Sequence, residues 1–529
     1  MITTQLRQPF TNGLIRSNYS RYNAEHCDEY DGLRPTQYGA TWLKDIGAFT
    51  ALTVTWPWPK IVQAGVNTLV FDAGTLYVLN GASLAALAPY DPTMTTPYTP
   101  VHATTERAFQ VAEFDNIWFA TNGAHFYYCH PINGSLGAQT PLLYGVAHVA
   151  AATLRVGCVA KHNGAFYASG FNPANARFTT AEFLQAFELW RAETTQEHVQ
   201  ETSVANTREE LSDTHVLVSR QLGGDKDWPF AAELALLGLP DSTEATAGYP
   251  LYADAIRKGQ LTFVQLPNAS RTLAMLPLGN MLVCYSGRGI SVIDENNVAH
   301  VLSSVGVLAA DTVVSAGSYH IFMDNVGQLW TIDANLKLTW LDATSTWNDD
   351  NFAALVSALA TKPVMLCHDP VDGETYISNG DISYCLTQQG LCKAWRGFTS
   401  QGMDGGNTKG YYVDLTPADG LAHIITSVTD LGSAARKVVH SVELGTIGLT
   451  NVKLRVSYRR DGTSAYVVTP WLIPVGGMFM VPCVDATQFK FEIKATPSAN
   501  CCIQYMNVNW YARDRRMHRG RLYNKIDKD

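Results

Sequence analysis

The chain has 529 residues, of which 46% are hydrophobic and only 16% are charged, and its formal net charge is −9. Its length predicts about two to four domains or one large repetitive domain. The charged fraction lies well below the roughly 25% typical of soluble globular proteins, and Gly, Tyr, Phe and Trp are plentiful. This composition excludes disorder and coiled coil, argues against a protein that coats nucleic acid, and indicates a sheet-rich surface partly covered by neighbouring subunits.

The ten cysteines form no framework, because no C-x-x-C pair and no cysteine–histidine quartet of zinc-ligand spacing occurs. We therefore expect reduced, mostly buried thiols and no structural metal. Residues 1–10 lack the apolar core of a secretory signal, and no run of about 18 apolar residues occurs. The sequence thus predicts a chain made in a cytosol, without a membrane-spanning segment.

Residues 1–50 mix polar, aromatic, Gly and Pro residues without a helical or a strand period. We expect an N-terminal arm that becomes ordered against another surface. The WPWP sequence at residues 56–59 is interpreted as a rigid connector rather than as a polyproline II docking motif.

From about residue 61 an apolar strand, a turn with Gly, Asn or Asp, and a second strand recur. β-Branched and aromatic residues on both arms predict hairpins, spaced by roughly 40–50 residues, the blade period of a β-propeller. We therefore predict a mainly β, propeller-like hairpin array in two parts, residues 51–174 and 263–431. The hairpins are expected at residues 66–79, 114–128, 164–169, 280–293, 319–332 and 364–386.

Between the two parts, residues 175–262 have a different pattern. Phe183, Phe187 and Trp190 would share one face of a helix capped by Thr179 or Thr180, and residues 228–239 and 249–258 are further helix candidates. Residues 175–260 carry 7 basic and 14 acidic side chains, a net charge of −7. We predict an acidic helical insertion between blades.

Residues 432–511 again alternate like strands, separated by turns, and predict a C-terminal β-sandwich-like platform domain. Strands are expected at residues 438–443, 452–458, 466–468, 479–481, 489–493 and 503–510. A basic tail, residues 512–529, follows. Residues 451–529 contain 13 basic and 6 acidic residues, a net charge of +7, which leaves −16 for residues 1–450.

No catalytic residue, cofactor-binding residue or metal ligand is predicted. The chain lacks a G-x-S-x-G elbow, an H-E-x-x-H pair, a P-loop and a complete G-x-G-x-x-G. Residues 324–330 approach the Asp-box of sialidases but have an extra residue between Asp and Gly, so a hairpin turn is favoured. A solvated loop is favoured for residues 26–29 (HCDE), and a turn for residues 369–374.

The basic C-terminal region is the candidate docking site. Arginines interleaved with aromatic residues are typical of protein interfaces, so we predict that this segment docks onto an acidic subunit surface or contacts phosphate. The candidate subunit-docking residues are Trp510, Tyr511, Arg513, Arg515, Arg516, Arg519 and Arg521.

Four stretches resemble the tail nozzle (tail hub) proteins of short-tailed bacteriophages, which include the packaged-DNA stabilisation proteins. YGATWLKDIGAF (38–49) resembles the end of their arm, and NGAFYASGFNPANARF (163–178) a strand-turn segment. NMLVCYSGRGISVI (280–293) with the following residues 304–332, and MLCHDPVDGETYISNGDISYCLTQQGLCKAW (365–395), resemble successive propeller blades. The acidic insertion departs from the family pattern.

The resemblance implies a non-enzymatic virion protein that assembles, as a homo-oligomer (a hexamer in the family), into a ring below the portal and its adaptor. Such a ring extends the DNA channel, retains the packaged genome, serves in DNA ejection and carries tail fibres or spikes. The implied location is the virion tail, assembled in the host cytoplasm. An acidic wall suits DNA that passes without being held. Two alternatives stay open: a propeller-type glycan-degrading enzyme, and a receptor-binding or fibre-adaptor module of a phage tail.

Overall fold

The structure is a computed structural model. The described residues are 1–14, 25–43, 60–64, 67–72, 75–80, 83–86, 110–114, 117–121, 126–130, 142–145, 157–170, 214–219, 261–267, 270–341, 364–369, 372–379, 382–394, 400–404, 407–411, 420–462 and 464–513. Most of these residues lie in β-strands, in agreement with the predicted mainly β fold.

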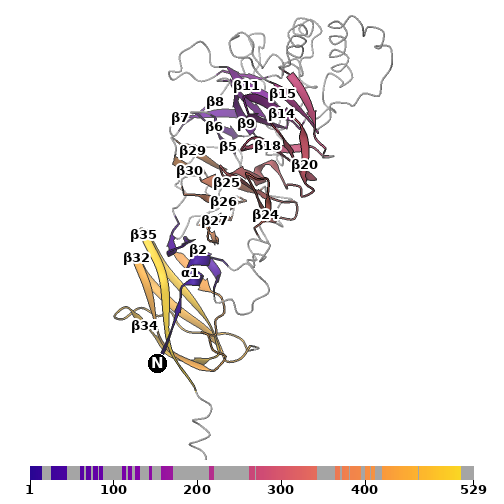
Figure 1. The fold of residues 1–529 in the computed structure, drawn as a ribbon. Coiled ribbons are helices and arrows are strands. Elements are labelled where there is room, and N and C mark those ends of the chain that lie inside the picture. The colour runs from indigo at the N-terminus through magenta and orange to yellow at the C-terminus, as the bar shows by residue number, and fades with distance from the viewer. Residues whose placement is uncertain are drawn as a thin grey trace, which may run out of the picture.

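The upper body in Figure 1 is built from antiparallel sheets that follow one another along the chain. Each of the first five sheets has four strands in sequence order, as the blades of a propeller do, and the sixth blade is a run of four such strands within a larger sheet. The first three are β5 (Lys60–Ala64), β6 (Asn67–Asp72), β7 (Thr75–Asn80) and β8 (Ser83–Ala86); β9 (Gln110–Phe114), β10 (Ile117–Thr121), β11 (Phe126–His130) and β12 (Leu142–Gly145); and β13 (Cys158–His162), β14 (Ala165–Ser169), β15 (His215–Ser219) and β16 (Leu261–Gln265).

The next sheets continue the series, and a two-stranded sheet comes last. A short 3-10 helix at Ala310–Thr312 precedes the fifth sheet. These sheets are β17 (Thr272–Leu278), β18 (Met281–Ser286), β19 (Gly289–Ile293) and β20 (Ala299–Ser303); β21 (Val313–Ser315), β22 (Tyr319–Met323), β23 (Leu329–Asp333) and β24 (Leu338–Trp340); β25 (Met365–Asp369), β26 (Glu374–Ser378), β27 (Ser383–Leu386) and β28 (Leu391–Lys393); and β29 (Ser400–Asp404) with β30 (Asn407–Tyr411).

The first strands of these sheets form a closed ring. β5 lies beside β9, β9 beside β13, β13 beside β17, β17 beside β21, β21 beside β25, β25 beside β29, and β29 beside β5 again. The described strands therefore make a propeller of seven blades, the last with two strands. Five of the six expected ranges contain a hairpin, whereas residues 164–169 hold only the strand β14, whose hairpin partner β13 precedes that range. The series of hairpins confirms the predicted propeller-like array.

Neighbouring blades pack through apolar faces. β19 is buried along its whole length, because blades cover both of its faces, whereas the outer strand β20 has no buried residue and is partly exposed. Met275, Leu282 and Cys284 of the fourth blade join Tyr167 and Val216 of the third in one core. The other face of the fourth blade shares a second core with the fifth blade.

The predicted insertion at residues 175–262 requires a correction. β15 lies inside this range and β16 begins within it, and both belong to the third blade. The two intervening stretches therefore connect strands of a single blade instead of separating two blades. The helix candidates at residues 179–192, 228–239 and 249–258 lie outside the described residues.

The lower body contains two long antiparallel strands, β32 (Lys437–Arg459) and β35 (Gln488–Ala512). The six expected strands are present, but four of them merge into these two. β34 (Met478–Ala486) pairs with the first half of β32, and β33 (Val467–Val468) with its second half. Register shifts and positive φ at Gly448 and Asn451 mark the middle of β32, and both halves contribute to one core. This arrangement agrees with the predicted sandwich-like domain.

The N-terminal segment is part of this domain, and it orders against the C-terminal strands of its own chain (Figure 1). β1 (Ile2–Leu6) pairs with β35, the short helix α1 (Gln8–Asn12) follows, and β4 (Gly39–Trp42) pairs with β3 (Leu33–Thr36) and with β35. β2 (Cys27–Asp31) lies between β28 of the sixth blade and β31 (Ala422–Thr426).

The domain boundaries shift accordingly. β31 pairs with β35, so the C-terminal sheet begins before the expected residue 432 and also includes the described part of residues 1–43. Through β2, this sheet is hydrogen-bonded to the sixth blade, and a single hydrophobic core runs across the junction. Within the described segments, no helix has the length and apolar character needed to cross a membrane.

Candidate docking surface and domain junction

Of the predicted docking residues, Trp510 and Tyr511 lie at the end of β35, and Arg513 directly follows this strand. Trp510 is only 5% exposed, and its Nε1 donates a hydrogen bond to Thr4 Oγ1 of β1 over 2.9 Å. The Lys437 ammonium lies 5.6 Å from the centre of the Trp510 ring. Trp510 is therefore occupied inside its own domain and is not a docking side chain, in contrast to the prediction. Tyr511 is exposed, so its side chain is accessible for docking as predicted for this segment.

Arg513 is half-exposed, and its guanidinium forms an ion pair with Asp485 of β34. The same carboxylate binds Arg436 over 2.6 Å, so two arginines converge on one acid. Arg513 holds the end of β35 against its neighbour and retains charge toward solvent. Arg515, Arg516, Arg519 and Arg521 lie outside the described residues.

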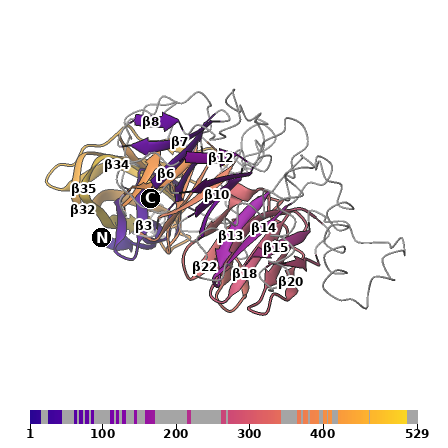
Figure 2. The same ribbon diagram turned by 90° about the horizontal axis from the view of Figure 1, so that it is seen from above.

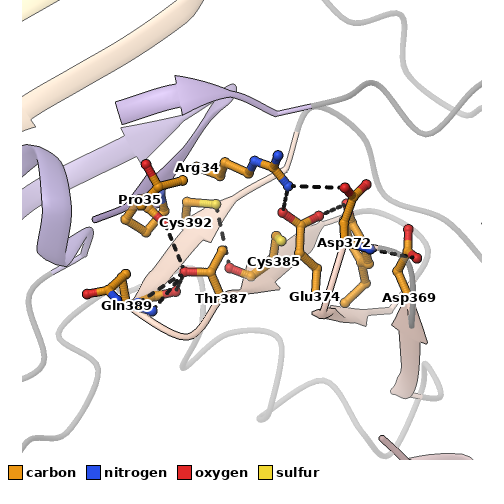
Figure 3. A network of polar contacts seen from close by, with 12 residues as sticks. Arg34, Pro35, Asp369, Asp372, Glu374, Cys385, Thr387, Gln389 and Cys392 are labelled. Atoms are coloured by element: carbon orange, nitrogen blue, oxygen red, sulfur yellow. Dashed lines mark hydrogen bonds and ion pairs between the residues drawn. The ribbon is translucent and has the colours of Figure 1, made fainter. Parts of the chain in front are cut away.

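A polar network fastens the N-terminal segment to the sixth blade (Figure 3). The Arg34 side chain leaves β3 and forms an ion pair with Glu374, and it lies 3.8 Å from Asp372 in the turn between β25 and β26. Glu374 also accepts a hydrogen bond from the Tyr376 hydroxyl over 2.8 Å. Burial raises the pKa of Glu374, and the bonds from Arg34 and Tyr376 oppose this rise.

Close backbone contacts support the same junction. Thr387 Oγ1 donates to the Pro35 carbonyl over 3.0 Å, and Leu14 N donates to the Leu391 carbonyl over 2.8 Å. Asp31 lies 3.6 Å from Lys393. Because backbone bonds, ion pairs and a shared core all cross the junction, the propeller and the C-terminal domain are braced against each other.

The exposed face of the β31–β35–β32 sheet carries alternating cations and aromatic rings. Trp471 has Arg455 at 4.6 Å and Lys494 at 5.6 Å from its ring centre, and Tyr466 similarly has Arg459 at 4.7 Å and Lys490 at 5.5 Å. Such contacts contribute about 0.5–1 kcal/mol each at exposed sites. They hold four cations in place on the surface of the domain. We call these residues, Arg455, Arg459, Lys490 and Lys494, the basic stripe.

One acid is embedded in this stripe. Glu492 accepts bonds from Arg455 and from His423, each over 2.8 Å. Burial acts to raise the pKa of Glu492, but the bonds from Arg455 and His423 outweigh it and hold the pKa below its ordinary value. Lys490 pairs with Asp28 of β2. The contact between Asp28 and Lys490 connects β2 to the basic stripe.

The motif residues weighed in the sequence do not converge on a ligand. Cys27 is buried with its thiol directed at the Pro9 carbonyl, Asp28 pairs with Lys490, and Glu29 lies 3.0 Å from His423. Of the turn at residues 369–374, Asp372 and Glu374 face Arg34. In the described part of the chain, no group of three His, Cys, Asp or Glu side chains has metal-binding geometry. The eight cysteines described there are free thiols, six of them buried, as predicted.

The near Asp-box is a hairpin turn, as predicted, but its aspartate has a role that the sequence analysis missed. Asp324 Oδ1 accepts the backbone N–H groups of Val326 and Gln328, both at 2.9 Å, and Oδ2 accepts Trp330 Nε1 at 2.8 Å. Asp294 and Asp333 hold their turns through the same two backbone bonds. The available sequence signal was an Asp followed three residues later by Asn or Gly, as in Asp294 with Asn297 and Asp324 with Gly327; Asp333, which is followed by Leu336, lacks it.

A buried histidine links the fourth and fifth blades. His320 Nε2 lies 3.0 Å from the Pro277 carbonyl, so this nitrogen carries the proton, and Nδ1 accepts from the Tyr285 hydroxyl at 2.9 Å. Burial lowers the pKa of His320 to about 4, although the bond to Pro277 acts to raise it. The ring is therefore neutral near pH 7 and serves as a polar contact between blades.

These observations define the class of protein: a seven-bladed β-propeller braced through its N-terminal segment to a sandwich-like domain with a basic outer face. No family model matches the chain, and no curated protein matches it. Solved structures give similarities with TM-scores of 0.29 to 0.32, which add nothing to the assignment of the fold.

Three of these structures share little sequence with the chain. PorZ, a surface component of the type-IX secretion system of Porphyromonas gingivalis, is 8% identical with a TM-score of 0.32, and the match covers 71% of this chain but only 42% of PorZ. The Neurospora crassa Pan2 WD40 domain is 7% identical with a TM-score of 0.31, covering 70% and 86%. BamB from Moraxella catarrhalis is 10% identical with a TM-score of 0.29, covering 69% and 92%.

Proposed function

We propose that this chain is a structural virion protein: the ring-forming nozzle or hub of a short bacteriophage tail. In this role it extends the DNA channel below portal and adaptor, retains the packaged genome and serves in its ejection. The observation that carries the proposal is the braced junction, in which one core and one hydrogen-bonded sheet span propeller and C-terminal domain. A subunit that transmits load along a tail needs its domains held in a fixed orientation.

Two further observations support the proposal. The chain combines a low charged fraction with a strong separation of charge, −16 for residues 1–450 against +7 for residues 451–529. Opposite charges on different parts of one chain favour ordered contacts between copies. The four sequence stretches that resemble nozzle proteins lie in the N-terminal segment and the propeller.

Negative-stain electron microscopy of the purified chain, together with mass spectrometry of virus particles from its source, tests the proposal. We expect closed rings and the chain in the particle tail. A chain that stays monomeric and is absent from particles contradicts it. Density at the periphery of the tail, rather than on its axis, would favour the fibre-adaptor alternative.

The glycan-degrading alternative rests on the propeller fold and on the aromatic richness of the chain. Incubating the protein with host polysaccharide and measuring new reducing ends separates it from the nozzle. We expect none, and their appearance in proportion to protein concentration would overturn a purely structural role.

A further inference from the structure

An uncharged segment forms one border of the C-terminal domain. Between Asp461 and Asp485, residues 462–484 contain no Asp, Glu, Lys, Arg or His. This segment provides β33, a tight turn and the start of β34. An exposed β-strand of a soluble domain ordinarily alternates apolar and polar residues, so an uncharged segment of this length at a domain surface requires a physical reason.

The outward side of this segment is aliphatic. Phe479 and Val481 point into the core, whereas Met478 and Met480, which alternate with them, are 43% and 51% exposed. Both faces of this part of β34 are therefore apolar. Six of the fifteen exposed large hydrophobic residues in the described part of the chain fall within residues 467–480: Val467, Val468, Ile473, Val475, Met478 and Met480. We call these six residues the aliphatic border.

The border is also an open sheet edge. Among the described strands, β33 and β34 each pair only with β32, so their other sides carry unpaired backbone groups. Val475 and Met478 close a two-residue turn in which Gly476 and Gly477 have φ of 60° and 83°. No atom lies within 4 Å of a Cβ built on either glycine, so the turn projects from the domain. An exposed apolar edge of this kind is a template for another protein surface.

Positive charge flanks the border. Leu472 forms an antiparallel β-bridge with Leu454, which places Lys453 of β32 beside the border. Lys453 is directly opposite Lys494 in the β32–β35 register. Two lysines directly opposite each other are unfavourable in an isolated sheet. Arg455 and Arg459 continue the basic stripe along the same face. The partner of this border should therefore combine aliphatic and acidic groups.

Such a surface exists on the propeller of the same chain. In the fourth blade, the outer edge strand β20 exposes Val301 at 61%, and the preceding turn exposes Val298 and the acidic Glu295. The carboxylate of Asp294 holds this turn and contacts His300 of β20. Figures 1 and 2 show β20 on the propeller and β34 in the lower body, well separated in both views, so the two surfaces are far apart within one chain. They can meet only between copies.

We propose that the aliphatic border of one copy docks onto the β20 edge of the fourth blade in a second copy. The contact joins unlike surfaces, so it propagates from head to tail and closes into a ring when the rotation between copies allows closure. This inference rests on the proposed ring-forming function and specifies the surface through which the copies associate. Aliphatic side chains supply the buried apolar area, and the lysines opposite the carboxylate of Glu295 fix the orientation.

The test measures assembly of the full-length chain by analytical ultracentrifugation over a range of concentrations. The double variant Val475→Asp and Met478→Asp places carboxylates in the border, where burial without a partner is costly. We expect the dissociation constant of the assembly to rise by about a hundredfold or more. Val326→Asp is the matched control, since Val326 and Val475 are both valines in turns and both 74% exposed. We expect it to assemble like the wild type.

Cysteine crosslinking then identifies the partner surface. Val475→Cys combined with Val301→Cys should form an intermolecular disulfide on treatment with diamide, whereas Val475→Cys with Val326→Cys should not. Both sets of substitutions lie at exposed positions, and unchanged near-ultraviolet circular dichroism verifies folding.

Two results would overturn the inference: assembly of the border variant with wild-type affinity, or equal crosslinking to both positions. If rings form in the wild type and equally in the border variant, the docking surface is refuted and the proposed nozzle function stands. If the wild-type chain is a monomer and is absent from virus particles, both fail.

Discussion

Arg34 and Glu374 lie 340 residues apart in the sequence, yet their side chains form an ion pair across the junction between the N-terminal segment and the sixth blade. Glu374 is almost fully buried, while Arg34 retains contact with solvent. The pair is therefore asymmetric. Without Arg34 the Glu374 carboxylate would be buried without a cation, whereas without Glu374 the Arg34 guanidinium would still contact water. This asymmetry gives the first prediction.

Arg34→Met should destabilise the chain more than Glu374→Gln does. The first change leaves a buried carboxylate without its cation, at a cost of about 3–5 kcal/mol. The second leaves a neutral amide that still accepts the Tyr376 hydroxyl, while Arg34 turns to water. Urea denaturation followed by tryptophan fluorescence measures both free energies of unfolding.

The double variant Arg34→Met with Glu374→Met is the control for this cycle. Replacing both partners by apolar groups is often close to neutral, so the double variant should be more stable than Arg34→Met alone. Additive losses in the double variant would show that the two side chains act independently and would contradict the asymmetric pair.

His320 predicts a loss of stability in mild acid. The pKa of His320 is about 4 in the folded chain, below the ordinary value of 6.5, so the folded state binds fewer protons than the unfolded state. Stability is therefore complete above about pH 6.5 and falls as the pH decreases toward 4, by about 3 kcal/mol from this group.

His320→Gln tests this prediction, because its amide can still donate to Pro277 but does not titrate. The variant should lose less stability than the wild type between pH 6.5 and 4, measured by thermal unfolding at each pH. Parallel pH profiles for the two proteins would exclude His320 as the source.

The features that the sequence alone predicted are those that depend on residues close together in the chain. Hairpins such as β18–β19 and β22–β23 combine alternating apolar residues with turn residues within about fifteen positions, so a single segment contains the whole signal. The closure of seven blades is a non-local property, because β29 and β5 meet although more than 300 residues separate them. No local pattern encodes that contact.

The junction could not be predicted for the same reason. β2 is a short acidic strand whose carboxylates pair with Lys490, His423 and Lys393, all distant in sequence. Trp510 was misplaced because an aromatic residue among arginines has interface composition, whereas its indole is covered by β1 of the same chain. The merging of expected strands into β32 reflects register shifts, which let one strand continue through Gly448 and Asn451.

Asp324 and Asp333 give a matched pair for the third prediction. Each accepts two backbone N–H groups of its turn, but only Asp324 also accepts Trp330 Nε1 and is nearly buried. Asp324→Ala should therefore cost about 2–4 kcal/mol, against about 1 kcal/mol for Asp333→Ala. Chemical denaturation measures the difference, and equal losses would show that the bond to Trp330 contributes nothing.

The basic tail gives a fourth prediction. Residues 514–529 carry six basic and three acidic side chains, and Arg513 already satisfies Asp485. Deleting residues 514–529 should therefore leave the melting temperature unchanged but weaken assembly or docking to the portal adaptor. Arg513→Ala is the control, because it removes the ion pair with Asp485 and leaves residues 514–529 in place. If the truncated chain enters virus particles as efficiently as the wild type, the tail has no docking role.

Gly39 gives the fifth prediction, because it allows the β3–β4 hairpin to lie against β35. Its φ is 131°, and a Cβ at this position would lie 2.1 Å from the Ile503 carbonyl oxygen, which is backbone and cannot move aside cheaply. Gly39→Ala should cost more than about 2 kcal/mol and separate the N-terminal segment from β35.

Gly164→Ala is the control, since Gly164 also has a positive φ, 68°, but no atom lies within 4 Å of the added Cβ. That change should cost only the backbone strain, about 1–2 kcal/mol. Hydrogen exchange of the β1 amides should rise in the first variant and not in the second, because β1 and β4 pair with the same strand; equal exchange in both would show that the close approach at Gly39 does not hold the segment in place.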